Sequence, residues 1–590
     1  MDQHSTRIGS SVLSKALERY FAQYFSRNPV NATFTGLHSL DDRLPDWSVD
    51  GRVHEADEMR RLRVALNDTA NPSIAQLRTN SVALDGELAR ANLDVRLAEH
   101  DSAFFQARNP ALWTGEAIFA VVSLMIRNFA TVEERVRSII ARLNAIPLFL
   151  AAMPESITSP VPTPWTGRAA RECAAADGLL DQGLHDWMKA NGVPQDSADR
   201  IHEAAGRARG AFRMAAAALA ALPGSDVGYA VGADTFGVLL RRGHFCTTDA
   251  HTLLEQALAG LPIEQQKLEA MAAASVPGSW TAVQAALAED HPTVDDYYAT
   301  FQRRWYDCHR IATKHNAVTW DAWPIRYVPI PAWAQPYAPH LYWLFYRSPA
   351  PFDPYNVYEY VVTPIDQSMT AEEQDRKLRA WNHSTITLNH VVHHGAVGHH
   401  VQNWHARHRC SSRIGRIAAT DCASRIAMFL GGSMAEGWAC YATQLMEELG
   451  MLTPLEQISE QHTRVRMLAR AIVDIRLHHG IITFAEAVQY YQDIVGMTVE
   501  IATAETTKNS MFPCTALMYW LGTTRILTLR EHLKAARGTQ FSLREFHDAL
   551  LSRGAIPVPL VATLMTELVM TEPVMTEPVM TEPVTTESGA

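Results

Sequence analysis

The 590-residue sequence has few cysteines, no long apolar run and no block of like charge. Its seven cysteines include no C-x-x-C pair, which argues against a zinc ribbon or a redox dithiol. Because no run of about 18 uncharged apolar residues occurs, we expect no membrane-spanning helix. The first twenty residues lack an apolar stretch followed by a small-residue cleavage site, so we expect a cytoplasmic protein.

Clustered basic residues are also lacking. The chain carries 52 lysines and arginines against 63 acidic residues, a net charge of -11, spread without long blocks. Phosphate binding needs a concentrated positive surface, so nucleic acid is not expected as a partner. The sequence contains no P-loop, dinucleotide fingerprint or G-x-S-x-G motif. We expect a peptide or small-molecule substrate and no membrane partner; the sequence leaves the oligomeric state open.

Apolar residues at helical spacing dominate what is present. The pattern predicts helices within residues 11–145, 169–189, 199–221, 253–274, 294–315 and 372–551. Residues 318–364 are different, because they are rich in proline, tyrosine and tryptophan and carry short β-prone runs. The predicted fold class is therefore mainly α, with a small irregular or β element at 318–364.

The chain is expected to form one helical domain over residues 1–561, with a possible N-terminal subdomain at 1–315 and a second at 372–561. After Val561 the unit Met-Thr-Glu-Pro-Val repeats from Met570, with imperfect copies on either side. Proline at every fifth position blocks helix propagation, and no aromatic residue is there to anchor a core. Residues 562–590 are therefore predicted to be a disordered tail.

Histidines concentrate in one short segment. Eight of the 25 lie there: His383, His390, His393, His394, His399, His400, His405 and His408. Imidazole is a common zinc ligand, and neighbouring histidines are costly to bury unless their nitrogens are used. The alternative is a histidine-rich exposed helix face, or core histidines bonded to the backbone. The residue types alone leave both interpretations open.

Spacing adds a geometric constraint. On a regular helix, His399 points about 120° away from His393, and His400 lies about 10.5 Å along the axis from it. Neither pair suits one ion held about 2.0–2.1 Å from each imidazole. The segment must therefore loosen or bulge, and Gly395 and Gly398 are the residues that allow this.

A third ligand is expected from another helix. Glu436 stands in the apolar stretch Met-Ala-Glu-Gly-Trp-Ala-Cys-Tyr, where a lone carboxylate is costly to bury. A metal ion would satisfy it, and an ordinary ion pair with an arginine is the alternative.

At these residues the sequence resembles the bacterial domain-of-unknown-function 885 family, whose members carry H-E-x-x-P-G-H-H-x-Q followed by E-G-W-A-x-Y-x-E. Four more segments are similar to family motifs: TFTGLHSLDDRLPDWS (33–48), RAIVDIRLH (470–478), PCTALMYWLG (513–522) and LREFHDALLSRGAIP (543–557). The match therefore extends over most of the chain.

The resemblance implies a zincin-like helical body around a deep channel, with metal-dependent peptidase or hydrolase activity. Carried onto this sequence, the ligands of one divalent ion, expected to be zinc, would be His393, His399 or His400, and Glu436. His399 is preferred because the second ligand histidine of other helical zincins follows a glycine, here Gly398.

Two further residues match family positions that could bind substrate or an oxyanion. These are His478, one helical turn after Asp474, and Tyr519. For each of them the alternative is a hydrogen-bonded core residue.

The sequence departs from the family at the site itself. His394 replaces the motif glutamate, which in a zincin accepts a proton from the attacking water. Val397 replaces the motif proline, and Thr443 stands where the second glutamate falls. Pro513-Cys514-Thr515 replaces Pro-Gly-Gln, and Lys508-Asn509 replaces Arg-Tyr.

An imidazole can also accept a proton near neutral pH. We therefore expect a metal-dependent hydrolase of an amide, peptide or related carbonyl bond, with His394 as altered general base and ordinary peptidase activity in doubt. The alternatives are a metalloenzyme that catalyses a non-hydrolytic elimination, cyclisation or isomerisation, and a non-catalytic metal-binding protein.

Overall fold

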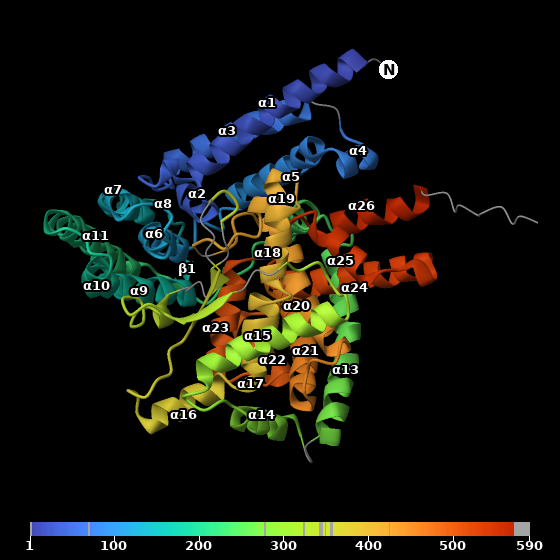
Figure 1. Ribbon diagram of the computed structural model, residues 1–590. Helices are drawn as coiled ribbons and strands as arrows, with labels where there is room; N and C mark the ends of the chain where they lie inside the picture. The colour runs from blue at the N-terminus through green and yellow to red at the C-terminus, as the bar shows by residue number, and fades with distance from the viewer. Residues whose placement is uncertain are drawn as a thin grey trace, which may run out of the picture.

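The computed structural model describes residues 3–68, 71–275, 279–321, 325–341, 346–347, 350–353, 358–423 and 425–571. Within these residues the chain is mainly helical, which confirms the predicted fold class (Figure 1). The predicted zincin-like channel stays a prediction.

The helices follow one another along the chain in three stretches. The first comprises α1 (Gln3–Arg27), α2 (Pro29–Thr35), α3 (Val49–Asn67), α4 (Ile74–Thr79), α5 (Ser81–Asp101), α6 (Pro110–Met125), α7 (Val132–Ala151), α8 (Met153–Ser156), α9 (Thr163–Gly178), α10 (Leu184–Ala190) and α11 (Gln195–Ala221). The second comprises α12 (Ala233–Val238), α13 (Ala250–Ser275), α14 (Trp280–Glu289), α15 (Tyr297–Lys314), α16 (Ala371–Ala380) and α17 (His383–Thr385). The third comprises α18 (His399–His408), α19 (Arg413–Ile417), α20 (Gly432–Glu448), α21 (Pro454–His478), α22 (Phe484–Val495), α23 (Val499–Met511), α24 (Met518–Arg537), α25 (Leu543–Leu551) and α26 (Val558–Thr571).

Two small sheets interrupt the helices. β3 (Arg326–Pro329) pairs in parallel with β5 (Glu359–Val362), and β4 (Tyr346–Arg347) pairs antiparallel with the other edge of β5. This sheet confirms the β element predicted within residues 318–364. The second sheet was not predicted, and it pairs β1 (Val161–Pro162) with β2 (Gly224–Ser225).

One continuous hydrophobic core runs through the molecule, from Ala16 in α1 to Met565 in α26. Figure 1 shows α18 and α20 near the centre of the body, with the long pair α1 and α3 above them. Helix α20 packs against α24 along its length, and it also contacts α15, α18 and α21. Glu436 therefore sits on a helix that is surrounded by others.

The tail begins later than predicted. Helix α26 continues to Thr571, and Leu564 and Met565 are buried in the core, so the predicted boundary after Val561 is wrong. The physical reason is that proline first returns at Pro573, so nothing before it blocks the helix. The predicted disorder of residues 572–590 lies outside the described residues.

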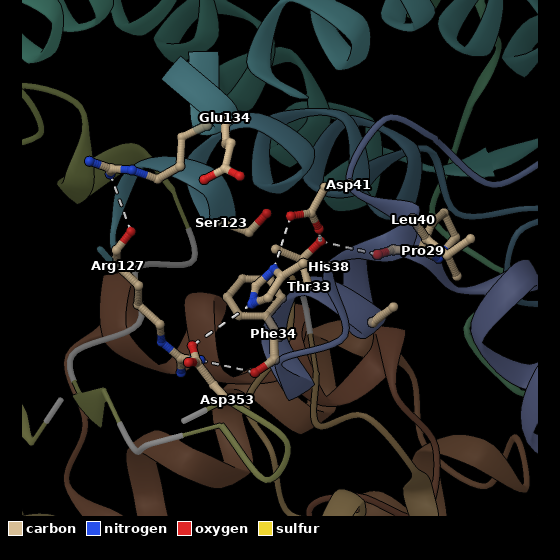
Figure 2. A network of polar contacts seen from close by, with 12 residues as sticks. Pro29, Thr33, Phe34, His38, Leu40, Asp41, Ser123, Arg127, Glu134 and Asp353 are labelled. Carbon is tan, nitrogen blue, oxygen red and sulfur yellow. Dashed lines mark hydrogen bonds and ion pairs between the residues drawn. The ribbon is translucent and has the colours of Figure 1, made fainter. Parts of the chain in front are cut away.

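The N-terminal family motif forms a polar network that joins distant segments (Figure 2). Gly36 ends α2 with a φ of 89°, and a Cβ there would lie 2.4 Å from the backbone nitrogen of Asp353. His38 lies between two carboxylates, with Nδ1 2.9 Å from Asp41 and Nε2 3.8 Å from Asp353. Its ring stacks on Phe129. These contacts join the end of α2 to Asp353 and Phe129.

We expect His38 to make the stability of the protein pH-dependent. Burial alone would lower the pKa of His38, but Asp353 and Asp41 outweigh it and raise the pKa from 6.5 to about 9. The stabilisation is therefore fully present below pH 6.5 and is lost as the pH rises towards 9, by about 2 kcal/mol after allowance for solvent screening. Urea unfolding of the wild type and of His38→Gln, each at pH 6.5 and at pH 9, measures how much the free energy of unfolding falls between the two pH values. A variant with an unchanged pH slope would contradict it.

Candidate metal centre

The histidine segment is not a regular helix. A π-helical stretch, η5 (Ile386–Gly395), carries His393, and α18 begins only at His399. Between them the backbone breaks, with Ala396 at φ -130° and ψ -119° and Gly398 at φ -69° and ψ -121°. This confirms the prediction that the segment loosens. The break brings His393 and His399 together, with ring centroids 4.9 Å apart.

Two tryptophans hold the break in place. The indole N–H of Trp305 donates to the carbonyl oxygen of Gly395 at 2.8 Å. The indole N–H of Trp438 reaches the carbonyl oxygens of Val397 and Gly398, at 2.9 and 3.1 Å. Trp438 belongs to the same E-G-W-A motif as Glu436, so one short piece of α20 both fixes the break and faces the histidines.

Glu436 meets both histidines. Its Oε2 lies 3.3 Å from Nε2 of His393 and 3.9 Å from Nε2 of His399. Two ligand atoms held about 2.0–2.2 Å from a tetrahedral ion are themselves about 3.4 Å apart, so the shorter distance already fits a shared ion. The structure therefore brings together the three residues that the sequence named as ligands, and their role as ligands stays a prediction.

The surroundings of the Glu436 carboxylate favour a cation beside it. Oε2 of Glu436 is buried and has no hydrogen-bond partner among the described residues. Burial raises the pKa of Glu436, but His393 and His399 beside it bring the pKa well below its ordinary value. A buried, ionised oxygen without a hydrogen bond is costly, and a cation between it and the two imidazoles would remove that cost. The residues present therefore fit a divalent ion.

Hydrogen bonds orient two of the imidazoles. Nδ1 of His399 lies 3.3 Å from Oε1 of Gln402, and Nδ1 of His394 lies 2.6 Å from the carbonyl oxygen of Asn389. An Nδ1–H that donates to an oxygen leaves Nε2 as the acceptor, which is the form that binds metals. Gln402 is the glutamine of the H-H-x-Q motif, and the sequence analysis gave it no role.

His394 belongs to the same cluster. One nitrogen from each of His393, His394 and His399 lies within 4.8 Å of the others. Burial, followed by the neighbouring His393 and His399, lowers the pKa of His394 well below its usual value, so its ring is neutral at pH 7. His394 is therefore placed to accept a proton at the centre or to join it as a ligand. His400 is fully buried beside Tyr358 and stands outside this cluster.

A cavity of about 680 Å³, which includes its opening to solvent, adjoins the centre at Glu436. Its polar lining includes Asp421, Lys508 and Tyr519. Its apolar lining includes Phe105, Leu239, Phe429, Phe512 and Met518. Tyr519, expected from the sequence to bind substrate or an oxyanion or else to be a core residue, lines this cavity. The guanidinium of Arg470 stacks over its ring at 4.7 Å.

The predicted catalytic role of His478 does not fit its position. The side chain is fully buried, does not line this cavity, and has Nε2 2.9 Å from the carbonyl oxygen of Asn509. On the same helix, Asp474 accepts the backbone N–H groups of Cys514 at 3.0 Å and Leu517 at 2.8 Å. This motif therefore fixes the chain that leads to Tyr519, and His478 is a hydrogen-bonded core residue.

Asp421 was not expected from the sequence to line a cavity, and Lys508 was expected only to be a departure from the family motif. Asp421 lies in an irregular turn that carries no motif, so no signal pointed to it. Lys508 carried one signal, because it replaces an arginine that precedes the loop to Tyr519. Both residues line the same cavity as Glu436.

Replacing Gly398 with alanine should destabilise the protein by about 3 kcal/mol. A Cβ on Gly398 would lie 1.9 Å from the carbonyl oxygen of His393, a backbone atom that no rotamer change can move. Gly206→Ala in α11 is the matched control, because a Cβ there has nothing within 4 Å and alanine is the better helix former. Urea unfolding of both variants measures the difference. Equal stability would contradict the close approach.

Comparison of the sequence with models of known protein families shows to which family the chain belongs. The family described as "Bacterial protein of unknown function (DUF885)" matches residues 29–565. The chain belongs to this family. No curated protein matches this DUF885 chain.

Two solved structures are similar to this DUF885 chain over nearly its whole length. One, from Shewanella oneidensis, is described as "a putative lipoprotein of unknown function"; it is 20% identical with a TM-score of 0.74, and the match covers 94% of this chain and 99% of that one. The other, described as "the putative lipoprotein from Colwellia psychrerythraea", is 17% identical with a TM-score of 0.75, and the match covers 96% and 100%. At these identities the likeness concerns the fold alone.

Within the described residues, no helix is both long enough and apolar enough to cross a membrane. The expectation of a cytoplasmic protein stays a prediction.

Proposed function

We propose that this chain is a metal-dependent hydrolase that acts on an amide, peptide or related carbonyl bond of a small substrate held in the cavity beside Glu436. The observation that most supports this is the buried Oε2 of Glu436, which faces two Nε2 atoms and has no hydrogen-bond partner in the described part of the chain. A set of two imidazoles and one carboxylate suits zinc or iron, and zinc is the expected ion.

The chain's own residues would divide the work as follows. His393, His399 and Glu436 hold the ion, which when bound polarises a carbonyl group and lowers the pKa of water. His394 accepts a proton at Nε2, while its Nδ1–H stays bonded to the carbonyl oxygen of Asn389. Tyr519, which lines the cavity, donates its hydroxyl to the developing oxyanion.

A second candidate is non-hydrolytic chemistry, in which the ion acts as a Lewis acid and His394 moves a proton within the substrate. The replacement of the family's glutamate by His394 favours it, because a neutral imidazole replaces an anion beside a dication.

Metal analysis and a cleavage assay test the proposal. We expect one zinc ion per chain in protein purified without chelator, and cleavage of members of a mixed peptide and acyl-amide library that stops when the metal is removed. Bound zinc without any cleavage would favour the non-hydrolytic candidate. A chain that takes up no zinc even after zinc is added would overturn both candidates.

A further inference from the structure

Lys508 contributes a positive charge to the wall of the cavity. It lies on α23, is half-buried, and makes no hydrogen bond or ion pair with any residue that the structure describes. We propose that its ammonium group binds a carboxylate of the substrate. This inference rests on the proposed function, and it narrows the substrate class.

The polar residues next to Lys508 on α23 form hydrogen bonds with other side chains and not with Lys508. Glu505, one turn earlier on α23, accepts two hydrogen bonds from the guanidinium of Arg470, at 2.6 and 3.0 Å. Asn509 donates to the hydroxyl of Tyr491 at 2.6 Å. Lys508 forms no ion pair with a described residue, but its ammonium group interacts at longer range with the carboxylates of Glu505, Glu436 and Asp421.

The charges of the cavity leave room for one more anion. Glu99 is already paired with Arg425 at 2.9 Å. Glu436 faces the histidines, and a dication held there would more than neutralise it. Asp421 then remains as the single unpaired carboxylate among the cavity residues named above, against a dication and the ammonium of Lys508. A cavity with an excess of positive charge attracts an anionic ligand.

The remaining walls of the cavity indicate that the substrate also carries an apolar group. Phe105, Leu239, Phe429 and Met518 give this side of the cavity an apolar surface. Sites of this kind bind an apolar body and fix its orientation with a few placed polar groups. The substrate class that fits is an amide or related carbonyl compound with an apolar group and a free carboxylate.

A pair of hydroxamates tests this inference. Hydroxamates bind metal ions, so a phenylalkyl hydroxamate that ends in a carboxylate and the methyl ester of the same compound differ only at the group assigned to Lys508. A series of chain lengths allows for the unknown spacing. Calorimetry on the zinc-loaded wild type should show the best carboxylate binding about tenfold tighter than its ester.

The variants isolate the contribution of Lys508. Lys508→Met should remove the preference for the carboxylate and leave ester binding and zinc content unchanged, whereas Lys508→Arg should keep most of it. Lys534→Met, at an exposed lysine beside Glu531 on α24, is the control and should behave as the wild type. A preference that persists in Lys508→Met, or is absent from the zinc-loaded wild type, would overturn the inference alone. A wild type that binds no zinc would overturn the proposed function with it.

Discussion

Replacing Glu436 with glutamine should weaken zinc binding on the order of a hundredfold or more, because even residues that only orient a ligand contribute 10–100-fold. The exchange keeps the size of the side chain and removes the charge that faces His393 and His399. Competition with a chromophoric chelator measures the affinity. Zinc should also raise the melting temperature of the wild type and not that of the variant, because an ion that binds only the folded state stabilises it.

Glu460 offers a matched control for this experiment. It is a buried carboxyl group on α21, 3.9 Å from Arg464, and it forms no ion pair with a histidine among the described residues. Burial raises the pKa of Glu460 to about 8, so its exchange for glutamine alters a buried carboxyl group away from the histidines. Glu460→Gln should therefore keep the zinc affinity of the wild type. If Glu436→Gln and His393→Ala both bind zinc as tightly as the wild type, the ion is held elsewhere, and the metal centre described above is wrong.

The sequence was most informative where simple geometry limited the answer. A spacing of six positions between His393 and His399 is incompatible with one ion on a regular helix, so the sequence alone predicts a break near Gly395 and Gly398. The choice between His399 and His400 could not be made on that basis. It depends on how the chain leaves the break, and the indole of Trp438, which holds the carbonyl oxygens of Val397 and Gly398, comes from a distant helix.

A motif shows that residues matter together without showing what they contact. His478 and Asp474 matched a family motif beside the site, yet they bond to backbone groups of Asn509, Cys514 and Leu517. The need to satisfy buried backbone groups is a tertiary effect, and a single sequence does not reveal which groups need a partner. The importance of Lys508, in contrast, could not be read from a motif. It follows from the structure, in which the neighbouring Glu505 and Asn509 are bonded to Arg470 and Tyr491.

The tail boundary failed for a local reason. The tail was predicted to begin after Val561, although the proline of the repeat, which blocks a helix, does not occur between Val561 and Pro573. Between them, apolar residues at helical spacing place Leu564 and Met565 in the core, where α26 packs against α4 and α24.

Replacing His394 with alanine should lower hydrolysis by about a hundredfold to ten-thousandfold, the usual contribution of a general acid or base, and should change zinc affinity little. His394→Glu restores the family's motif residue. In the zinc-loaded protein it should have much of the activity that His394→Ala loses, because a carboxylate beside a dication accepts a proton readily. Turnover of a substrate cleaved by the wild type, with zinc content measured in parallel, gives both values for each variant.

The same two measurements separate the two roles that the position of His394 allows. A proton acceptor affects turnover but not affinity, whereas a third imidazole ligand affects affinity first, because its nitrogen lies within 4.8 Å of those of His393 and His399. The absorption spectrum of the cobalt-substituted protein adds an independent test, since it depends on the number and geometry of the ligands. An unchanged spectrum in His394→Ala together with lost turnover supports the acceptor. A changed spectrum with weakened metal binding would instead make His394 a ligand, and hydrolysis would then need a proton acceptor from elsewhere in the cavity.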